Sequence, residues 1–432
     1  MDSKLVNILL LSFAFFTIFF AFRSATSLQK KILQAANTKE HTFKNSGIIS
    51  LGIFYCVFAA TCWFVPHLVA VVGPRWALIF GTFTYLIFII HYVQPFEWLL
   101  YALNVTLGVG SAITYIAQGN YIARNSDALT ATRNSGIFIT CQQGSNLISA
   151  ILIFFEYANV ETFEDTDRYI IISVLAVICL IGLMMVIFLR SPPNNQSIER
   201  SKNSCASVFI AIKLNILLLL ERDMLLLTVI FIYSGVVQSF YSGTYGPAMV
   251  FTKELNAESG EAYFMGAICK ACGGLLGALF FAILGNASVR WGRDLFIYLA
   301  GAFHLAAFVL IYLDIPDAST FGATHESSVI KPPNLYLAIT CTFLYGLGAS
   351  FYTVHIYSIL ACAFVAGSTP GFAIYKFFQC LACALAYLYS RHASLYIQMG
   401  ILIVLLIAAV ACFAFVERRR KETGVRGAEP AN

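Results

Sequence analysis

Three cations lie inside long apolar segments of this sequence, and they are the residues best placed to do chemistry: Arg23, Lys270 and Lys376. A charged residue within a membrane span costs about 2.5–3.5 kcal/mol on insertion scales, so such residues usually mark a functional site. The Asp and Glu residues fall in polar segments or near the ends of apolar ones. Cations without an acid nearby favour attraction of an anionic or polar neutral solute.

Each cation also has a plainer explanation. Arg23 and Lys376 lie close enough to the ends of their segments for their side chains to snorkel toward the membrane surface. Lys270 lies deeper, at about 12 Å into its segment with a rise of about 1.5 Å per residue. Small residues share its helix face, namely Gly266, Ala267, Gly273, Gly274 and Gly277. This packing face points Lys270 either into a central cavity or into a buried bond to a carbonyl.

Neutral polar residues lie in the apolar segments at helical spacing, so that several share one face of a helix. The candidates for binding a solute are Asn104, Tyr115, Gln118, Gln142, Asn146, Gln238, His355 and Gln379, the last beside Lys376. For each residue the alternative is an interhelical hydrogen bond, worth about 0.6–2 kcal/mol. Their concentration in corresponding segments of the two halves of the chain favours one shared central site.

The composition requires membrane helices to carry these residues. Of the 432 residues, 59% are hydrophobic and 11% are charged, and the mean hydropathy is +0.77. Soluble domains average about 45–50% apolar and about 25% charged residues, so the composition excludes a soluble enzyme, a nucleic-acid binder and a disordered chain. The sequence contains no nucleophile elbow, Walker loop or extramembrane metal-ligand cluster, and we expect neither catalysis nor a cofactor.

Windowed hydropathy predicts twelve membrane-spanning helices, since a span needs about 20 apolar residues. The predicted spans are Leu5–Thr26, Gly47–Val72, Trp76–Val93, Trp98–Ile122, Gly136–Tyr157, Tyr169–Leu189, Met224–Tyr245, Ala262–Leu284, Leu295–Leu313, Leu335–Cys362, Gly371–Ser390 and Leu395–Val416. The apolar stretch Ala206–Leu218 is too short to span and predicts an interfacial helix. The expected fold class is an all-α, multi-pass membrane protein.

The longest polar gap between interior spans divides the chain into two sets of six. It contains Pro192 and Pro193, which stop a helix. We expect an N-terminal bundle at 1–189, a linker at 190–223, a C-terminal bundle at 224–416 and a basic tail at 417–432. Lys and Arg are in excess in the loops on one side, and the positive-inside rule places that side and both termini in the cytoplasm.

Short internal matches indicate that the two sets of spans are repeats. Gly136-Ile137-Phe138-Ile139-Thr140-Cys141-Gln142 parallels Ala373-Ile374-Tyr375-Lys376-Phe377-Phe378-Gln379 at an offset of 237 residues. Gly108-Val109-Gly110-Ser111 parallels Gly346-Leu347-Gly348-Ala349 at an offset of 238. Two matches at nearly the same offset are typical of a transporter built from duplicated bundles.

A loop motif points to a particular superfamily. The stretch Gly285-Asn286-Ala287-Ser288-Val289-Arg290-Trp291-Gly292-Arg293 resembles the cytoplasmic Gly-x-x-x-Asp-Arg-x-Gly-Arg motif of the major facilitator superfamily, with Val289 at the Asp position. Its glycines are expected to permit a tight turn. The equivalent loop of the first half keeps Gly73 and Arg75. Because the superfamily motif acts as a latch during transport, its erosion weighs against ordinary transport.

Within that superfamily, the chain most resembles the uncoordinated-93-like family. The resembling stretches are Asn7–Thr17, Val72–Pro74, Gln94–Phe96, Ala117–Asn120, Arg133–Phe138, Glu221–Leu225, Gly346–Gly348 and Phe372–Gln379. The resemblance implies a fold similar to that of solute carriers. It also implies regulatory roles, because founding members are described as partners of potassium channels and another relative as a chaperone for innate immune receptors. Relatives carry uncharged or acidic residues in place of Arg23 and Lys270.

Two functions therefore stay open. The first is a solute carrier of major facilitator type for a small polar or anionic solute, which the intramembrane cations favour. The second is a non-transporting accessory subunit of an ion channel or other membrane protein, which the family and the eroded motif favour. In both, the chain is an integral membrane protein in contact with the lipid bilayer, and we expect no nucleic-acid partner.

Overall fold

The structure is a computed structural model, and it describes residues 3–35, 46–157, 165–190, 204–255, 261–364 and 368–422. These residues form an all-α protein. Its helices are α1 Ser3–Ala35, α2 Ser46–Cys62, α3 Val65–Val72, α4 Pro74–Ile90, α5 Glu97–Arg124, α6 Ala131–Leu152, α7 Asp165–Ile187, α8 Ser204–Leu220, α9 Arg222–Ser239, α10 Gly246–Phe251, α11 Glu261–Trp291, α12 Arg293–Asp314, α13 Leu335–Ala363, α14 Ser368–Tyr389 and α15 Leu395–Glu422. Within the described ranges there is no β-strand, only an isolated bridge between Thr252 and Thr324.

Among the described residues, eleven helices are long and apolar enough to cross a membrane, and a bent pair, α2 with α3, adds a twelfth if it counts as one span. Helices suit this environment because all their backbone hydrogen bonds are made within the segment. The predicted fold class, an all-α multi-pass membrane protein of major facilitator type, is confirmed.

Several helices continue beyond the spans that hydropathy predicts. The first predicted span ends at Thr26, but α1 continues to Ala35. The predicted span ending at Leu284 belongs to a helix, α11, that continues to Trp291, so Gly285 lies inside a helix and not in the expected loop. Hydropathy marks the apolar length that a bilayer requires, whereas a helix can extend into the polar region without losing backbone hydrogen bonds.

The second predicted span, Gly47–Val72, is not one straight helix. It bends by 61° between α2 and α3. Pro66 lies in the first turn of α3. A helix tolerates proline there, because the N–H groups of the first turn have no partner within the helix. If α2 and α3 were one continuous helix, the proline ring would clash with the preceding turn. The short helix α8, close to the predicted Ala206–Leu218, supports the bend, because Asn215 Nδ2 donates to the Trp63 carbonyl at 3.2 Å.

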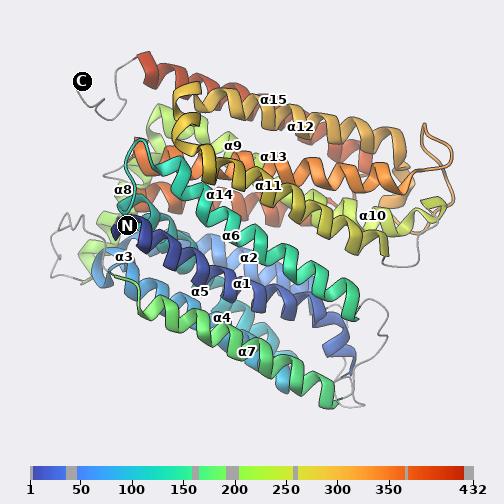
Figure 1. Cartoon of the computed structure of the whole chain (residues 1–432), viewed down its shortest axis with the longest axis horizontal. Helices are drawn as coiled ribbons and strands as arrows, with labels where there is room; N and C mark the ends of the chain where they lie inside the picture. Colours follow the sequence, from blue (N-terminus) through green and yellow to red (C-terminus); the bar gives the residue numbers. More distant parts are fainter. Residues whose placement is uncertain are drawn as a thin grey trace.

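The helices pack in two groups that meet along a seam (Figure 1). One group contains α1, α2, α4, α5, α6 and α7, and the other contains α9, α11, α12, α13, α14 and α15. Between the groups, α6 lies against α11, while α2 and α5 lie against α14. The start of α1 and the end of α15 lie near the same end of the bundle in Figure 1. We call this end, which carries Arg75, Arg293 and Arg419, the basic end.

Glycines allow this close helix contact. A Cβ atom on Gly136 of α6 would overlap the backbone of Ala282 in α11. A Cβ atom on Gly285 of α11 would overlap the backbone of Arg133 in α6. Helices in lipid associate through such close packing because the surrounding lipid is as apolar as their side chains.

The first prediction concerns this seam. Replacing Gly136 with Val should lower the stability of the purified protein by about 1–3 kcal/mol, because overpacking forces α6 and α11 apart. Thermal unfolding in detergent measures the effect. The matched control is Gly400→Val in α15, where a Cβ atom would have no neighbour within 4 Å. Equal effects of the two substitutions would contradict close packing at Gly136.

Candidate functional site

Arg23 and Lys270 lie in different helix groups, within electrostatic range of each other. Arg23 of α1 is exposed, Lys270 of α11 is partly exposed, and their charges interact. Arg23 also lies within electrostatic range of Tyr55 in α2, Tyr115 in α5 and Tyr387 in α14. These neighbours come from both helix groups, so Arg23 lies near the seam.

No acid neutralises this pair of cations in the described part of the chain. The ion pairs there involve other cations and lie elsewhere in the bundle. Two like charges that interact inside a protein destabilise each other more strongly than in water, because the effective dielectric constant is lower. An anion between Arg23 and Lys270 would remove this repulsion.

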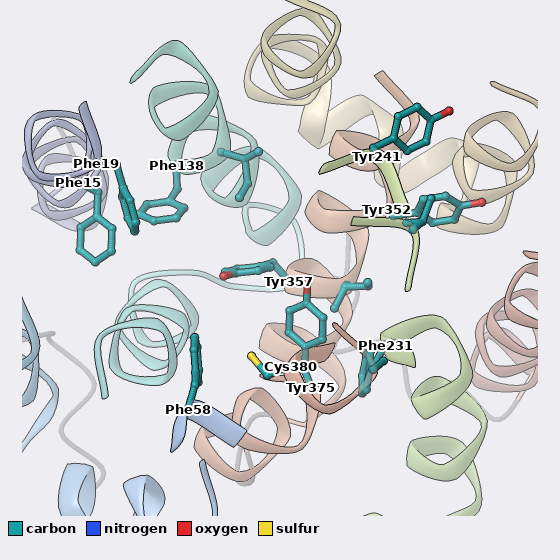
Figure 2. Packing of buried hydrophobic residues seen from close by; sticks show 14 of the residues in the cluster. Phe15, Phe19, Phe58, Phe138, Phe231, Tyr241, Tyr352, Tyr357, Tyr375 and Cys380 are labelled. Atoms are coloured by element: carbon teal, nitrogen blue, oxygen red, sulfur yellow. The ribbon is translucent and has the colours of Figure 1, made fainter. Parts of the chain in front are cut away.

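Lys376 of α14 is held differently, in a box of tyrosines. Its Nζ atom lies 4.4 Å from the ring centroid of Tyr375, 4.7 Å from that of Tyr115 and 5.9 Å from that of Tyr357. It donates a hydrogen bond of 2.8 Å to Gln379 Oε1. The side chain is only 7% exposed. Figure 2 shows Tyr357 and Tyr375 together with Cys380 in the centre of the packed core.

The tyrosine box accounts for a buried charge at this position. Cation–π contacts contribute about 0.5–2 kcal/mol each, and a hydrogen bond to a charged group contributes about 1.5–3 kcal/mol. Together they match the ~2.5–3.5 kcal/mol cost of a cation in a span. The box therefore stabilises the charge of Lys376 without neutralising it.

Three of the predicted polar residues lie at or near the tyrosine box. Gln118 of α5 is fully buried, and its Oε1 accepts a hydrogen bond of 3.3 Å from the Tyr357 hydroxyl. Gln142 of α6 hydrogen-bonds the Tyr115 side chain. Gln238 of α9 donates to the Tyr55 hydroxyl at 3.4 Å, across the seam. These contacts place Gln118, Gln142 and Gln238 around the meeting point of α2, α5, α6, α9 and α14.

Asn146 reaches the seam through a residue that was not among the candidates. Its Nδ2 donates to Gln143 Oε1 at 2.7 Å, and Gln143 Nε2 donates to Ser350 Oγ of α13 at 3.2 Å. Ser350 in turn donates to the Gly274 carbonyl of α11 at 2.7 Å. Gln143 follows Gln142 directly and lies beside the polar face of α6, but its position in the sequence gave no signal that it bonds across to the other helix group.

Two predicted residues lie apart from the others. Asn104 is buried, and its Nδ2 donates to the Leu100 carbonyl of its own helix at 2.7 Å. His355 is fully buried inside the second helix group, between the rings of Phe281 and Phe296. Neither contact brings these side chains to Arg23, Lys270 or Lys376.

Two acids that the sequence places near span ends are buried. Asp314, at the end of α12, is fully buried, and its Oδ1 accepts from the Asn334 backbone N–H at 2.6 Å. Glu417 of α15 is paired with Arg293 of α12 at 3.3 Å, with exposed fractions of 7% and 14% for the two side chains. Their burial could not be predicted from the sequence, because both residues lie next to polar loops and hydropathy gives no information on packing between helices.

Neutral hydrogen bonds close the seam at the basic end. Asn120 Nδ2 of α5 donates to Thr369 Oγ1 of α14 at 2.7 Å and to Ser368 Oγ at 3.3 Å. The Thr132 hydroxyl of α6 and the Ser358 hydroxyl of α13 are 2.8 Å apart. Since no full charges are involved, these contacts can be exchanged for contacts with water at modest net cost.

The two motif regions lie at this end. Gly73 and Gly292 have φ angles of +84° and +95°, so each makes the tight turn expected of the motif glycines. Arg75 donates to the Ile187 carbonyl at the end of α7, and Arg293 donates to Ser358 at 3.2 Å in addition to its ion pair. Arg290 is exposed at the end of α11.

The start of the predicted basic tail belongs to a helix. The described residues 417–422 continue α15. Arg419 and Arg420 pair with Asp223 of α9 at 2.8 and 3.0 Å, and Lys421 pairs with Asp294 of α12. These cations therefore join three helices of the second group.

Comparison with known families agrees with the architecture. A family model described as "Ion channel regulatory protein UNC-93" matches residues 38–414. The chain belongs to the UNC-93 family. It is 31% identical over 431 residues to the UNC93-like protein MFSD11 of Xenopus tropicalis and 32% identical over 432 residues to that of Xenopus laevis, with 96% of each chain covered. It is 23% identical over 361 residues to Protein unc-93 homolog A of Bos taurus, covering 74% of this chain and 76% of the relative. The family resemblance drawn from the sequence is confirmed.

The second prediction concerns the buried ion pair of this UNC-93 family member. Replacing Glu417 with Gln should lower stability by about 3 kcal/mol, because Arg293 would keep a buried charge without its acid. The matched control is Arg418→Gln. Arg418 is 64% exposed and lies 3.9 Å from Asp294, so its loss should change stability by less than about 1 kcal/mol. Urea unfolding of the purified protein compares the two variants, and a Glu417→Gln effect as small as the control would contradict the pairing.

Proposed function

We propose that this UNC-93 family member binds a small anionic or polar solute between α1 and α11 and carries it across the membrane by facilitation or exchange. The observation that carries the proposal is the pair Arg23 and Lys270. Arg23 is exposed, Lys270 is partly exposed, their charges repel, and no described acid forms an ion pair with either one. A solute with a negative charge would relieve the repulsion at the point where the two helix groups meet.

Support for movement comes from the contacts across the seam. At the basic end the groups are joined through neutral amides and hydroxyls, whereas the ion pairs of Glu417, Asp223 and Asp294 lie within the second group. In the proposal, residues 1–189 and 224–416 move as two bodies around a fixed site, as in other carriers with repeated bundles. Among the described residues, the hydrogen bonds that opening the basic end would break are uncharged.

The proposal places the basic end in the cytoplasm. Arg75, Arg293 and the cations of α15 lie at this end, and the positive-inside rule assigns such an end to the cytoplasmic face. In this orientation, we propose that the solute reaches Arg23 and Lys270 from the opposite compartment.

A second function has support of its own. The family model is described by ion channel regulation, and the same fold can bind another membrane protein without moving a solute. In that case the cations of the seam have a structural role, and a channel subunit or similar membrane protein is the ligand. Loss of the seam cations then leaves partner binding intact.

The third prediction tests the carrier. A thermal-shift screen of purified protein against metabolites should find stabilisation by one class of anion, since a ligand of the folded state raises its stability. Lys270→Met and Arg23→Met should each weaken binding of that anion about 10- to 100-fold, the loss expected for one charged hydrogen bond. The control is Lys253→Met, which removes an exposed cation of η4 Lys253–Leu255.

Uptake into proteoliposomes then separates the two functions. In a carrier, the solute found by the screen enters the vesicles and Lys270→Met abolishes its uptake. If no solute stabilises the protein, or if Lys270→Met transports normally, the carrier proposal is wrong. Co-purification of the same membrane partner with wild type and Lys270→Met would then favour the accessory function.

A further inference from the structure

Lys376 keeps an unused hydrogen-bonding capacity inside its tyrosine box. Its ammonium group has three N–H donors, and among the described residues Gln379 Oε1 accepts one of them. The ring faces of Tyr115, Tyr357 and Tyr375 lie around it, but a ring face offsets a positive charge without neutralising it. A net positive charge therefore remains in a side chain that is only 7% exposed.

A second buried donor lies beside the same ring. Gln118 is fully buried, and its Nε2 atom has no hydrogen-bond partner. Its Oε1 atom accepts from the hydroxyl of Tyr357, whose ring lines the box around Lys376. A buried amide N–H without an acceptor is unfavourable, and such groups in a folded protein call for an explanation.

We infer that Lys376 and Gln118 bind one small inorganic anion of halide type, such as chloride. Lys376 supplies a charge that no described acid pairs with, and Gln118 supplies an N–H that has no described acceptor. The near-complete burial of both side chains and the aromatic walls favour a small, weakly hydrated ion over an organic acid. Neither of these two donors belongs to the Arg23 and Lys270 pair, and the inference holds whether or not the protein transports a solute.

Bound anion would strengthen the contact between the two helix groups. Gln118 belongs to α5 in the first group, whereas Tyr357 and Lys376 belong to α13 and α14 in the second. An ion held by both sides joins α5 to α14 near the hydrogen bonds of Asn120 with Ser368 and Thr369. Halide binding should therefore favour the state that is closed at the basic end.

The fourth prediction tests this site by thermal unfolding of the full-length purified protein at constant ionic strength. Replacing sodium gluconate with sodium chloride or sodium bromide should raise Tm in a saturable way. The rise should be lost in Lys376→Met and in Gln118→Leu. It should persist in Lys253→Met, the cation control, and in Lys270→Met, which separates this site from the proposed solute site.

A third variant keeps the test decisive if Lys376→Met or Gln118→Leu fails to fold. Gln118→Glu replaces the amide N–H with a carboxylate beside Tyr357, whose ring lines the box, so chloride should no longer change the Tm of this variant. Binding of radioactive chloride to the wild type, absent in Gln118→Glu, should agree. The inference is overturned if the wild type shows no halide-dependent rise in Tm, or if Gln118→Glu retains the full rise.

Discussion

The close approach of α6 to α11 is the constraint on which the other features depend. Gly136 and Gly285 leave no room for a Cβ atom at this seam, and the polar chain from Asn146 through Gln143 and Ser350 crosses it. Lipid gives apolar helices little reason to associate, so shape fit and hydrogen bonds must hold them together. The fit then fixes the positions of the cations on α1, α11 and α14.

The three intramembrane cations have two different kinds of surroundings. Lys376 is enclosed by tyrosine faces and bonded to Gln379, so its charge is stabilised where it lies. Arg23 and Lys270 have no such enclosure and remain accessible. Two like charges without an acid destabilise a helix bundle, but they attract an anion. For this reason we place the proposed solute site at Arg23 and Lys270.

Much of the fold could be predicted from hydropathy, because a bilayer imposes a fixed apolar length on every span. The bend at Trp63 was not predicted from the sequence. Pro66 lies close to it, but a proline in an apolar segment is compatible with either a kinked helix or a broken one. The packing face of Gly273 and Gly274 beside Lys270 followed from helical spacing and is present in the structure. The contacts of Gln143 and Glu417 depend on helices far apart in sequence, and periodicity within one helix carries no information about them.

A density map of the protein in a lipid nanodisc, at a resolution that shows side chains, would reveal how Arg23 and Lys270 lie. We expect both side chains to turn toward the seam between α1 and α11, with no carboxylate in contact with either, and an added anionic ligand to give density between them. A map in which either cation forms an ion pair with an acid of the chain, or points into lipid, would contradict a solute site at this pair.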